Sequence, residues 1–269
     1  MDKRPIGIFD SGLGGLTVLK AIKKIMPNED IIYFGDSKRT PYGSKSKETI
    51  INYSIQDVKF LLSKNVKAII IACNTVSSNA IKQLKEKTDI PIIEVIKPGA
   101  YISTTITKKK KIGVIATKAT INSKAYEYAI NKIDKDITVY SKSCPLLVPL
   151  VEEGKSWWNN TITKEIIKYY LESLVNEEID TLVLGCTHYP LLQDAINEVV
   201  ENKITLINSA GEVAKEALTV LKNLKLLNTS GKGSLKLYTS DRISKFYPLA
   251  KDILEDNTIK VDKINIEEY

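Results

Sequence analysis

The chain has 269 residues, of which 43% are hydrophobic and 26% charged, a composition typical of soluble proteins with one large domain or two modest ones. No apolar run approaches the roughly 18 residues that span a bilayer, and no signal peptide precedes the first strand, so we expect a cytoplasmic protein without membrane segments. The net charge is +7, but the lysines are scattered among acidic residues, which disfavours nucleic-acid binding as the main function. Three distant cysteines disfavour a disulfide framework and a zinc site.

The first part of the chain alternates short apolar runs with helical patterns. Residues 6–9 form a predicted strand, a glycine-rich turn follows over 10–15, and a helix extends over 16–26, where Pro27 ends it. The next predicted elements are a strand over 31–34, a helix over 47–63, a strand that ends before Cys73, a helix over 76–87 and a strand over 92–95. Strands separated by helices of this length form a parallel sheet that is covered on both faces. The predicted fold class is therefore α/β.

The breaker pair Pro98-Gly99 follows a predicted strand and predicts the crossing into a second domain. The pattern then restarts with a strand over 111–115, a helix that ends near 131, a strand over 138–142, an irregular apolar stretch over 146–151, a helix over 163–176, the strand before Cys186, a helix over 191–201 and a strand over 205–208. From 210 onward, a helix, a strand over 235–238, a helix over 243–254 and a short extended segment are expected to return to the first domain. We predict two pseudosymmetric doubly wound domains with mainly parallel sheets, residues 1–97 with 210–269 and residues 98–209, and an active site in the cleft between them.

Two cysteines occupy equivalent places in the two predicted halves. Residues 68–75 read Ala-Ile-Ile-Ile-Ala-Cys-Asn-Thr, and residues 182–188 read Leu-Val-Leu-Gly-Cys-Thr-His, which includes the only histidine in the chain. Cys186 could also be a small buried side chain, and His188 a hydrogen-bonded loop residue. Ligands of doubly wound sheets bind at the carboxyl ends of the strands, so the repeated pattern favours Cys73 and Cys186 facing one substrate.

Other candidate groups also follow predicted strands. The turn over 10–15, Asp-Ser-Gly-Leu-Gly-Gly, precedes a helix, which lets backbone N–H groups bind an anion. It lacks the third glycine of a dinucleotide fingerprint, and no P-loop lysine follows it. Glu152 ends an apolar stretch and is either a carboxylate of the site or a simple turn residue. Trp157 and Trp158 are either an exposed recognition patch or part of the core.

Several longer motifs occur in a fixed order along nearly the whole chain. They are Ile6–Leu16, Tyr33–Asp36, Pro41–Gly43, Ile71–Thr75, Ile112–Thr117, Cys144–Pro145, Leu150–Glu152 and Leu184–Pro190. Taken together, they make the chain similar to the glutamate racemase branch of the cofactor-independent aspartate/glutamate racemase superfamily.

This resemblance implies a two-base, stereoinverting proton transfer at the α-carbon of glutamate, which supplies D-glutamate for peptidoglycan synthesis. It implies no cofactor and no metal, and it suggests a homodimer. Cys186 would act on L-glutamate with the help of His188 and Glu152, and Cys73 would act on D-glutamate with the help of Asp10. The substrate-binding residues that it implies are Asp10, Ser11, Tyr42, Gly43, Asn74, Thr75, Thr117 and Thr187.

Three other functions are compatible with the same residues. An aspartate racemase would need the same thiols and a tighter pocket. A hydrolase or transferase could use Cys186 and His188 as nucleophile and base, which leaves Cys73 unexplained. A binding module for anionic small molecules or nucleic acid would keep the cysteines inert in its core. The sequence does not decide whether Glu152 or Glu153 faces the site, and we expect Glu152 because it directly follows Leu150-Val151.

Overall fold

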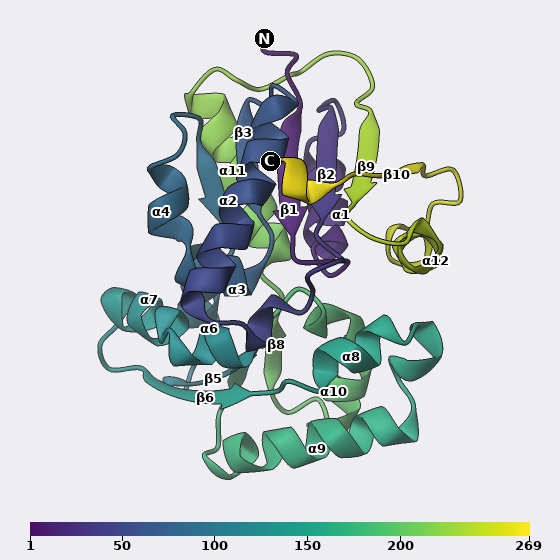
Figure 1. Ribbon diagram of the computed structural model, residues 1–269. Helices are drawn as coiled ribbons and strands as arrows, with labels where there is room; N and C mark the ends of the chain where they lie inside the picture. Colours follow the sequence, from purple (N-terminus) through teal and green to yellow (C-terminus); the bar gives the residue numbers. More distant parts are fainter.

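Two parallel β-sheets organise the chain in the computed structural model, which describes residues 1–269 (Figure 1). The strands of the first sheet are β1 (Ile6–Asp10), β2 (Ile31–Gly35), β3 (Ala68–Ile71), β4 (Ile92–Glu94), β9 (Leu235–Thr239) and β10 (Val261–Lys263), and those of the second are β5 (Lys111–Ala116), β6 (Thr138–Ser143), β7 (Thr181–Gly185) and β8 (Thr205–Ile207). Every neighbouring pair of strands is parallel. The predicted α/β class with two mainly parallel sheets is confirmed.

The two sheets share one internal strand order. The first runs β10-β9-β2-β1-β3-β4 and the second runs β6-β5-β7-β8, so both contain a unit in which the first strand lies between the second and the third. This shared order agrees with the prediction of two related halves. In each unit the third strand leads to a cysteine, since Cys73 comes two residues after β3 and Cys186 directly after β7. The topology therefore gives the two cysteines equivalent positions.

Helices cover both faces of each sheet. They are α1 (Leu16–Ile25), α2 (Lys47–Ser63), α3 (Asn74–Asn79), α4 (Ile81–Lys85), α5 (Ile96–Ile106), α6 (Lys118–Asn122), α7 (Ala125–Ile133), α8 (Leu147–Glu152), α9 (Thr161–Asn176), α10 (Gln193–Val199), α11 (Ala210–Asn223) and α12 (Ile243–Leu254). Short 3₁₀ turns occupy Tyr42–Ser44, Lys155–Trp157, Tyr189–Leu192 and Ile266–Glu268. None of the helices is both long enough and apolar enough to span a lipid bilayer.

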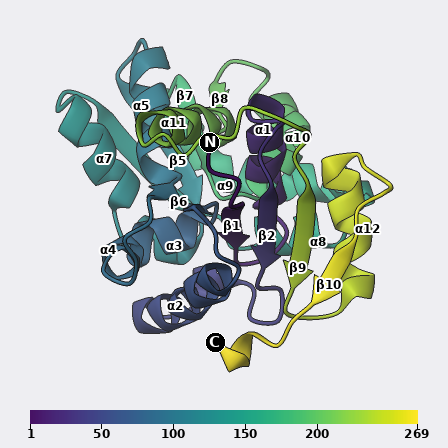
Figure 2. The ribbon, with the colours of Figure 1, turned by 90° about the horizontal axis from the view of Figure 1, so that it is seen from above.

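The strands are apolar throughout because both of their faces are buried. In β1, Ile6 and Ile8 pack with α1 and α11, whereas Phe9 points to the opposite face and packs with α2. Figure 2 shows the first sheet between α1 on one face and α2 on the other. Alternate residues of β5 and β7 divide in the same way between α5 and α7 on one face and α8, α9 and α10 on the other.

The residues at the predicted domain crossing, Pro98-Gly99, lie in helix α5, which the sequence did not predict. Pro98 lies in the first turn of α5, where proline is tolerated because the first N–H groups of a helix have no helical partner. The N–H of Gly99, the next residue, already donates to the carbonyl of Val95 at 3.3 Å. Glu94 takes over the capping, because its carboxylate accepts hydrogen bonds from the backbone N–H groups of Ile96 at 2.5 Å and Lys97 at 3.2 Å. The carboxylate of Glu94 thus stabilises the start of a helix that contains Pro98 and Gly99.

Three other predicted elements differ in the structure. The stretch over 146–151, predicted to be irregular, is mostly helical and forms α8. The single helix predicted over 76–87 is divided into α3 and α4 at Ala80. The helix predicted to end near 131 is divided into α6 and α7, because Lys124 adopts a left-handed backbone conformation with φ 55°. The breaks at Ala80 and Lys124 follow from backbone geometry that the apolar periodicity does not encode.

The connections between the two sheets show which segments of the chain build each sheet. Helix α5 packs against β7 and β8 of the second sheet, whereas α11 packs against α1 and β4 of the first. The chain then continues into β9 and β10, which extend the first sheet beyond β2. The strands before β5 and after β8 therefore build one sheet, and the division into residues 1–97 with 210–269 and residues 98–209 stays a prediction.

A buried ion pair lies at the amino ends of β2 and β3, opposite the ends that carry the site. Lys67 Nζ donates to Glu29 Oε2 at 2.5 Å and to the backbone carbonyl of Asp2 at 2.8 Å. Neither charged side chain has exposed surface. Because Glu29 Oε1 also accepts from the backbone N–H of Asn228 at 2.8 Å, the pair ties together four separate segments of the chain.

We expect Lys67→Met to lower the free energy of unfolding by about 3–5 kcal/mol, because the carboxylate of Glu29 would remain buried without its counter-charge. The matched control is Lys215→Met, which removes an exposed ion pair with Glu212 and should change stability by less than about 1 kcal/mol. Urea denaturation of the three proteins measures both effects. Equal losses for the two variants would contradict this role of Lys67.

Candidate active site

Cys73 and Cys186 reach one buried cavity from the two sheets. The exposed fraction is 4% for Cys73 and 6% for Cys186. The residues that line the cavity are Ser11, Thr40, Pro41, Tyr42, Gly43, Cys73, Asn74, Thr75, Thr117, Val148, Cys186, Thr187 and His188. All the residues predicted for the site lie in this lining except Asp10 and Glu152, which lie directly behind it and contact Thr187 and His188 respectively. The structure thus brings the predicted residues together around one space.

On the side of the first sheet, Cys73 lies beside a hydroxyl and near a carboxylate. Its Sγ donates to Ser11 Oγ at 3.6 Å, and Asp10 at the end of β1 accepts from the backbone N–H of Gly12 at 3.0 Å. Burial and the negative charge of Asp10 raise the pKa of the Cys73 thiol to about 12. Burial also raises the pKa of Asp10, although the nearby His188 acts in the opposite direction. Cys73 therefore carries its proton at neutral pH.

On the side of the second sheet, His188 lies between Cys186 and Glu152. Its Nδ1 is 3.8 Å from Cys186 Sγ, and its Nε2 is 3.4 Å from Glu152 Oε1, a separation at which opposite charges attract without a well-aligned hydrogen bond. Burial alone would lower the pKa of His188, but Cys186 and Glu152 together raise it to about 10. The histidine is therefore an imidazolium at neutral pH.

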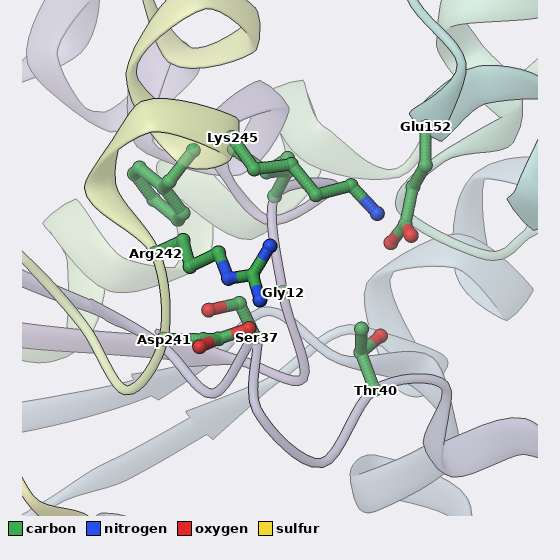
Figure 3. A pocket seen from close by; sticks show the side chains of 9 residues that line it. Gly12, Ser37, Thr40, Glu152, Asp241, Arg242 and Lys245 are labelled. Carbon is green, nitrogen blue, oxygen red and sulfur yellow. The ribbon is translucent and has the colours of Figure 1, made fainter.

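Glu152 connects this ring to a second, more open pocket. The pocket is lined by Gly12, Leu13, Ser37, Thr40, Glu152, Asp241, Arg242, Lys245 and Phe246. Figure 3 shows that the ammonium group of Lys245, from α12, extends toward the carboxylate of Glu152. Burial would raise the pKa of Glu152, but His188 and Lys245 hold it below its usual value. Glu153 is exposed, so the expectation that Glu152 is the inward residue agrees with the geometry.

Hydrogen bonds join the two halves across the cavity. Thr187 Oγ1 donates to Asp10 Oδ1 at 3.2 Å, and the hydroxyls of Thr75 and Thr117 are 2.9 Å apart. Gly14 approaches the second half so closely that a Cβ atom there would lie 2.3 Å from Thr187 Oγ1. The glycine-rich turn after β1 is therefore shaped by contact with the opposite half as well as by its own helix.

The loop that carries Tyr42 and Gly43 is fixed by three charged residues, of which only Asp36 belongs to a motif noted in the sequence. The hydroxyl of Tyr42 contacts the carboxylates of Asp36 and Asp57, and Arg39 Nη2 donates to Asp57 Oδ1 at 3.0 Å. The Tyr42 hydroxyl is thus engaged away from the cavity, and burial raises its pKa. Asp57 lies in the middle of α2, where an acidic residue normally belongs to the solvated face, so no local signal could have identified it.

The cavity offers thiols, hydroxyls, an amide and one buried imidazolium. Such groups can bind the carboxylates of a small molecule and can transfer protons at a carbon between the two thiols. No group of three or more His, Cys, Asp and Glu side chains is placed to bind a metal ion.

Comparisons with known proteins agree with the resemblance that the motifs indicate. The model of the Asp/Glu/Hydantoin racemase family matches residues 12–217. The chain belongs to this family. A glutamate racemase from Sulfurihydrogenibium sp. strain YO3AOP1 is 46% identical over 265 residues, which are 98% of each chain. The structure of this racemase-family member also resembles two solved structures over nearly their whole lengths. One is a glutamate racemase from Francisella tularensis in complex with D-glutamate, with a TM-score of 0.93, 40% identity and coverage of 100% of both chains. The other is a glutamate racemase from Bacillus anthracis, with a TM-score of 0.93, 38% identity and coverage of 98% of both chains.

The single histidine of this racemase-family protein makes its charge directly measurable. We expect ¹⁵N NMR of the His188 ring to report a pKa well above the usual 6.5 and near 10. Glu152→Gln should lower this pKa because it removes the negative partner, whereas Glu153→Gln, the matched control at the exposed neighbour, should leave it unchanged. An imidazole that titrates near 6.5 in the wild-type protein would refute the assignment.

The same shift predicts how stability depends on pH. The folded state holds the His188 proton up to about pH 10, whereas the unfolded chain loses it near pH 6.5. The contribution of the protonated His188 to the free energy of unfolding is therefore complete below pH 6.5 and disappears as the pH rises toward 10. Urea denaturation at pH 6, 8 and 10 should show the stability difference between wild type and Glu152→Gln decreasing with pH. A difference that grows with pH would contradict this sign.

Proposed function

We propose that the protein interconverts L- and D-glutamate by a cofactor-independent proton transfer between Cys73 and Cys186. The observation that carries this proposal is the pair of thiols from equivalent strand ends that line one buried cavity. The substrate is inferred from family membership and from the Francisella tularensis relative, whose structure was determined in complex with D-glutamate. We further propose that the product serves peptidoglycan synthesis, that the enzyme is cytoplasmic and that it forms a homodimer.

The charges around the two thiols support different starting roles for them, with Cys186 as the base and Cys73 as the acid when L-glutamate is bound. Cys73 is protonated because its pKa is raised to about 12, whereas the imidazolium of His188 places a positive charge 3.8 Å from Cys186. In this state the thiolate of Cys186 removes the α-proton of L-glutamate, and the thiol of Cys73 delivers its own proton to the opposite face. The products are D-glutamate, a neutral Cys186 and a Cys73 thiolate, and the reverse reaction restores the starting state.

The other residues of the site bind the substrate and assist the thiols. Ser11, Thr75, Thr117 and Thr187 supply hydroxyls, Asn74 supplies an amide, and Tyr42 and Gly43 form the wall that faces Thr117. Asp10 acts on the Cys73 side, and His188 with Glu152 acts on the Cys186 side. An amino-acid α-proton is a very weak acid, so this reaction needs fixed dipoles and the exclusion of water. The near-complete burial of both thiols suits this requirement.

One observation also favours a second candidate, a cysteine-dependent hydrolase or transferase. Cys186, His188 and Glu152 lie in a row with spacings of 3.8 and 3.4 Å, which is the order of nucleophile, base and orienting acid in such enzymes. This candidate assigns no role to Cys73. A covalent adduct of Cys186 with an acyl substrate, detected by mass spectrometry, would support it over the racemase.

We expect the purified, reduced protein without added cofactor to racemise glutamate in both directions, which circular dichroism of L- and D-glutamate solutions follows directly. Cys73→Ser and Cys186→Ser should each lower kcat/KM at least about 100-fold, because serine is a much weaker acid than cysteine at the proton-transfer position. The matched control is Cys144→Ser, at the third buried cysteine, which lies outside the cavity lining.

A folded wild-type protein that leaves the ellipticity of both enantiomers unchanged would refute the proposed function. A Cys73→Ser or Cys186→Ser variant with wild-type turnover would instead refute the two-base assignment.

A separate prediction concerns where the solvent hydrogen enters. In deuterated water, each enantiomer should be converted into its mirror image with deuterium at the α-carbon, while the remaining substrate stays mainly protiated during the first turnovers. This pattern arises because one thiol removes the proton and the other delivers a solvent-derived one from the opposite face. NMR and mass spectrometry of the separated enantiomers measure it. Product that retains the substrate's own proton would point to a single base.

A further inference from the structure

Tyr126 lies outside the predicted site, yet it contacts a residue next to each of the two thiols, Asn74 after Cys73 and Gly185 before Cys186. It belongs to α7 of the second half and is only 3% exposed. Its hydroxyl crosses to the first half and donates to Asn74 Oδ1 at 2.7 Å. Because Asn74 directly follows Cys73, this hydrogen bond connects α7 with the residue next to one thiol.

The ring of Tyr126 fits against two glycines. A Cβ atom on Gly185, the residue before Cys186, would lie 3.1 Å from the ring carbon Cε2. A Cβ atom on Gly99, in α5, would lie 3.2 Å from the ring carbon Cε1 and from the hydroxyl. Both distances are shorter than ordinary van der Waals contacts, so larger residues at these positions would displace the ring. Because glycine has no side chain, both positions leave room for the ring in the orientation that directs its hydroxyl to Asn74.

The hydrogen bond decides which end of the Asn74 amide faces the cavity. Oδ1 of Asn74 accepts the hydrogen bond from Tyr126, whereas Nδ2 donates to no group of the protein. Asn74 also lines the cavity. A carboxylate accepts hydrogen bonds but cannot donate them, so it is recognised by the NH₂ end of an amide and not by its oxygen.

We propose that Tyr126 is a positioning residue that holds the Asn74 amide with its NH₂ group toward the cavity, where it donates to a carboxylate of the substrate. The orientation of the amide follows from the structure alone, and only the identity of the substrate rests on the proposed function. Burial raises the pKa of Tyr126, and the charges of Glu94 and Cys186 act in the same direction. The hydroxyl therefore remains a donor while the charge of Cys186 changes during the reaction.

Tyr126→Phe tests this role because it removes the hydroxyl and keeps the ring. We expect KM to rise about tenfold for both enantiomers, equivalent to about 1.4 kcal/mol, while kcat changes less than about threefold. The matched control is Tyr128→Phe, in the same helix at a side chain that is 73% exposed, and it should leave both constants unchanged. A KM within twofold of wild type for Tyr126→Phe would overturn the proposal.

A double-mutant cycle separates positioning from a general packing role. In the Asn74→Ala background no amide remains to be oriented, so the further change Tyr126→Phe should alter KM less than about twofold. If Tyr126→Phe has the same effect in both backgrounds, it acts independently of Asn74 and the proposal is wrong.

A readout without activity separates this proposal from the proposed function. The side-chain NH₂ signals of Asn74 in the ¹⁵N NMR spectrum are identified by their loss in Asn74→Ala. We expect Tyr126→Phe to shift or broaden them and Tyr128→Phe to leave them in place, even if wild-type protein fails to racemise glutamate. Signals that are unchanged in Tyr126→Phe would refute the positioning role, whatever the enzyme assay shows.

Discussion

The two thiols of one buried cavity lie in opposite electrostatic surroundings, and the proposed chemistry depends on this difference. Cys73 faces the carboxylate of Asp10, which together with burial raises the pKa of Cys73 to about 12. Cys186 faces the imidazolium of His188, whose own pKa is raised to about 10. Low dielectric in a buried site strengthens both interactions. Two halves with the same strand order can therefore present the same side chain once as a proton donor and once beside a positive charge.

The imidazolium itself needs support, because an isolated buried charge is costly. Glu152 supplies a negative partner at 3.4 Å, and Lys245 in turn lies near Glu152 at the edge of the neighbouring pocket. Charges of alternating sign thus lead from the buried cavity toward more open surroundings (Figure 3). On the other side, Asp10 is held by the N–H of Gly12 and by the hydroxyl of Thr187 from the opposite half. Each half therefore helps to set the charge on the other half's side of the cavity.

The sequence predicted the strands from local pattern, and the residues that it proposed for the site line one cavity, except Asp10 and Glu152. Parallel strands buried on both faces are apolar runs, and a cysteine or polar residue after such a run lies at the edge where ligands bind. The helix α5 was missed because Pro98-Gly99 reads as a break, while its cap, Glu94, looks like the last residue of a strand. Asp57 and Tyr126 were missed for a related reason. Both stand within helices, where only tertiary contacts distinguish a buried functional side chain from an ordinary one.

Hydrogen bonds across the cavity also bear on how the site selects its ligand. The hydroxyls of Thr75 and Thr117, one from each half, are 2.9 Å apart, and the hydroxyl of Thr120 lies 3.0 Å from that of Thr117. A carboxylate that accepts from both hydroxyls replaces one neutral hydrogen bond with two charge-assisted ones, which are stronger. An apolar ligand that separates the two threonines would break their hydrogen bond without replacing it, at a cost of about 0.5–1.5 kcal/mol, and would leave the two hydroxyls only their contacts with Thr120. The hydrogen bond between Thr75 and Thr117 therefore also disfavours ligands that lack a hydrogen-bond acceptor at this position.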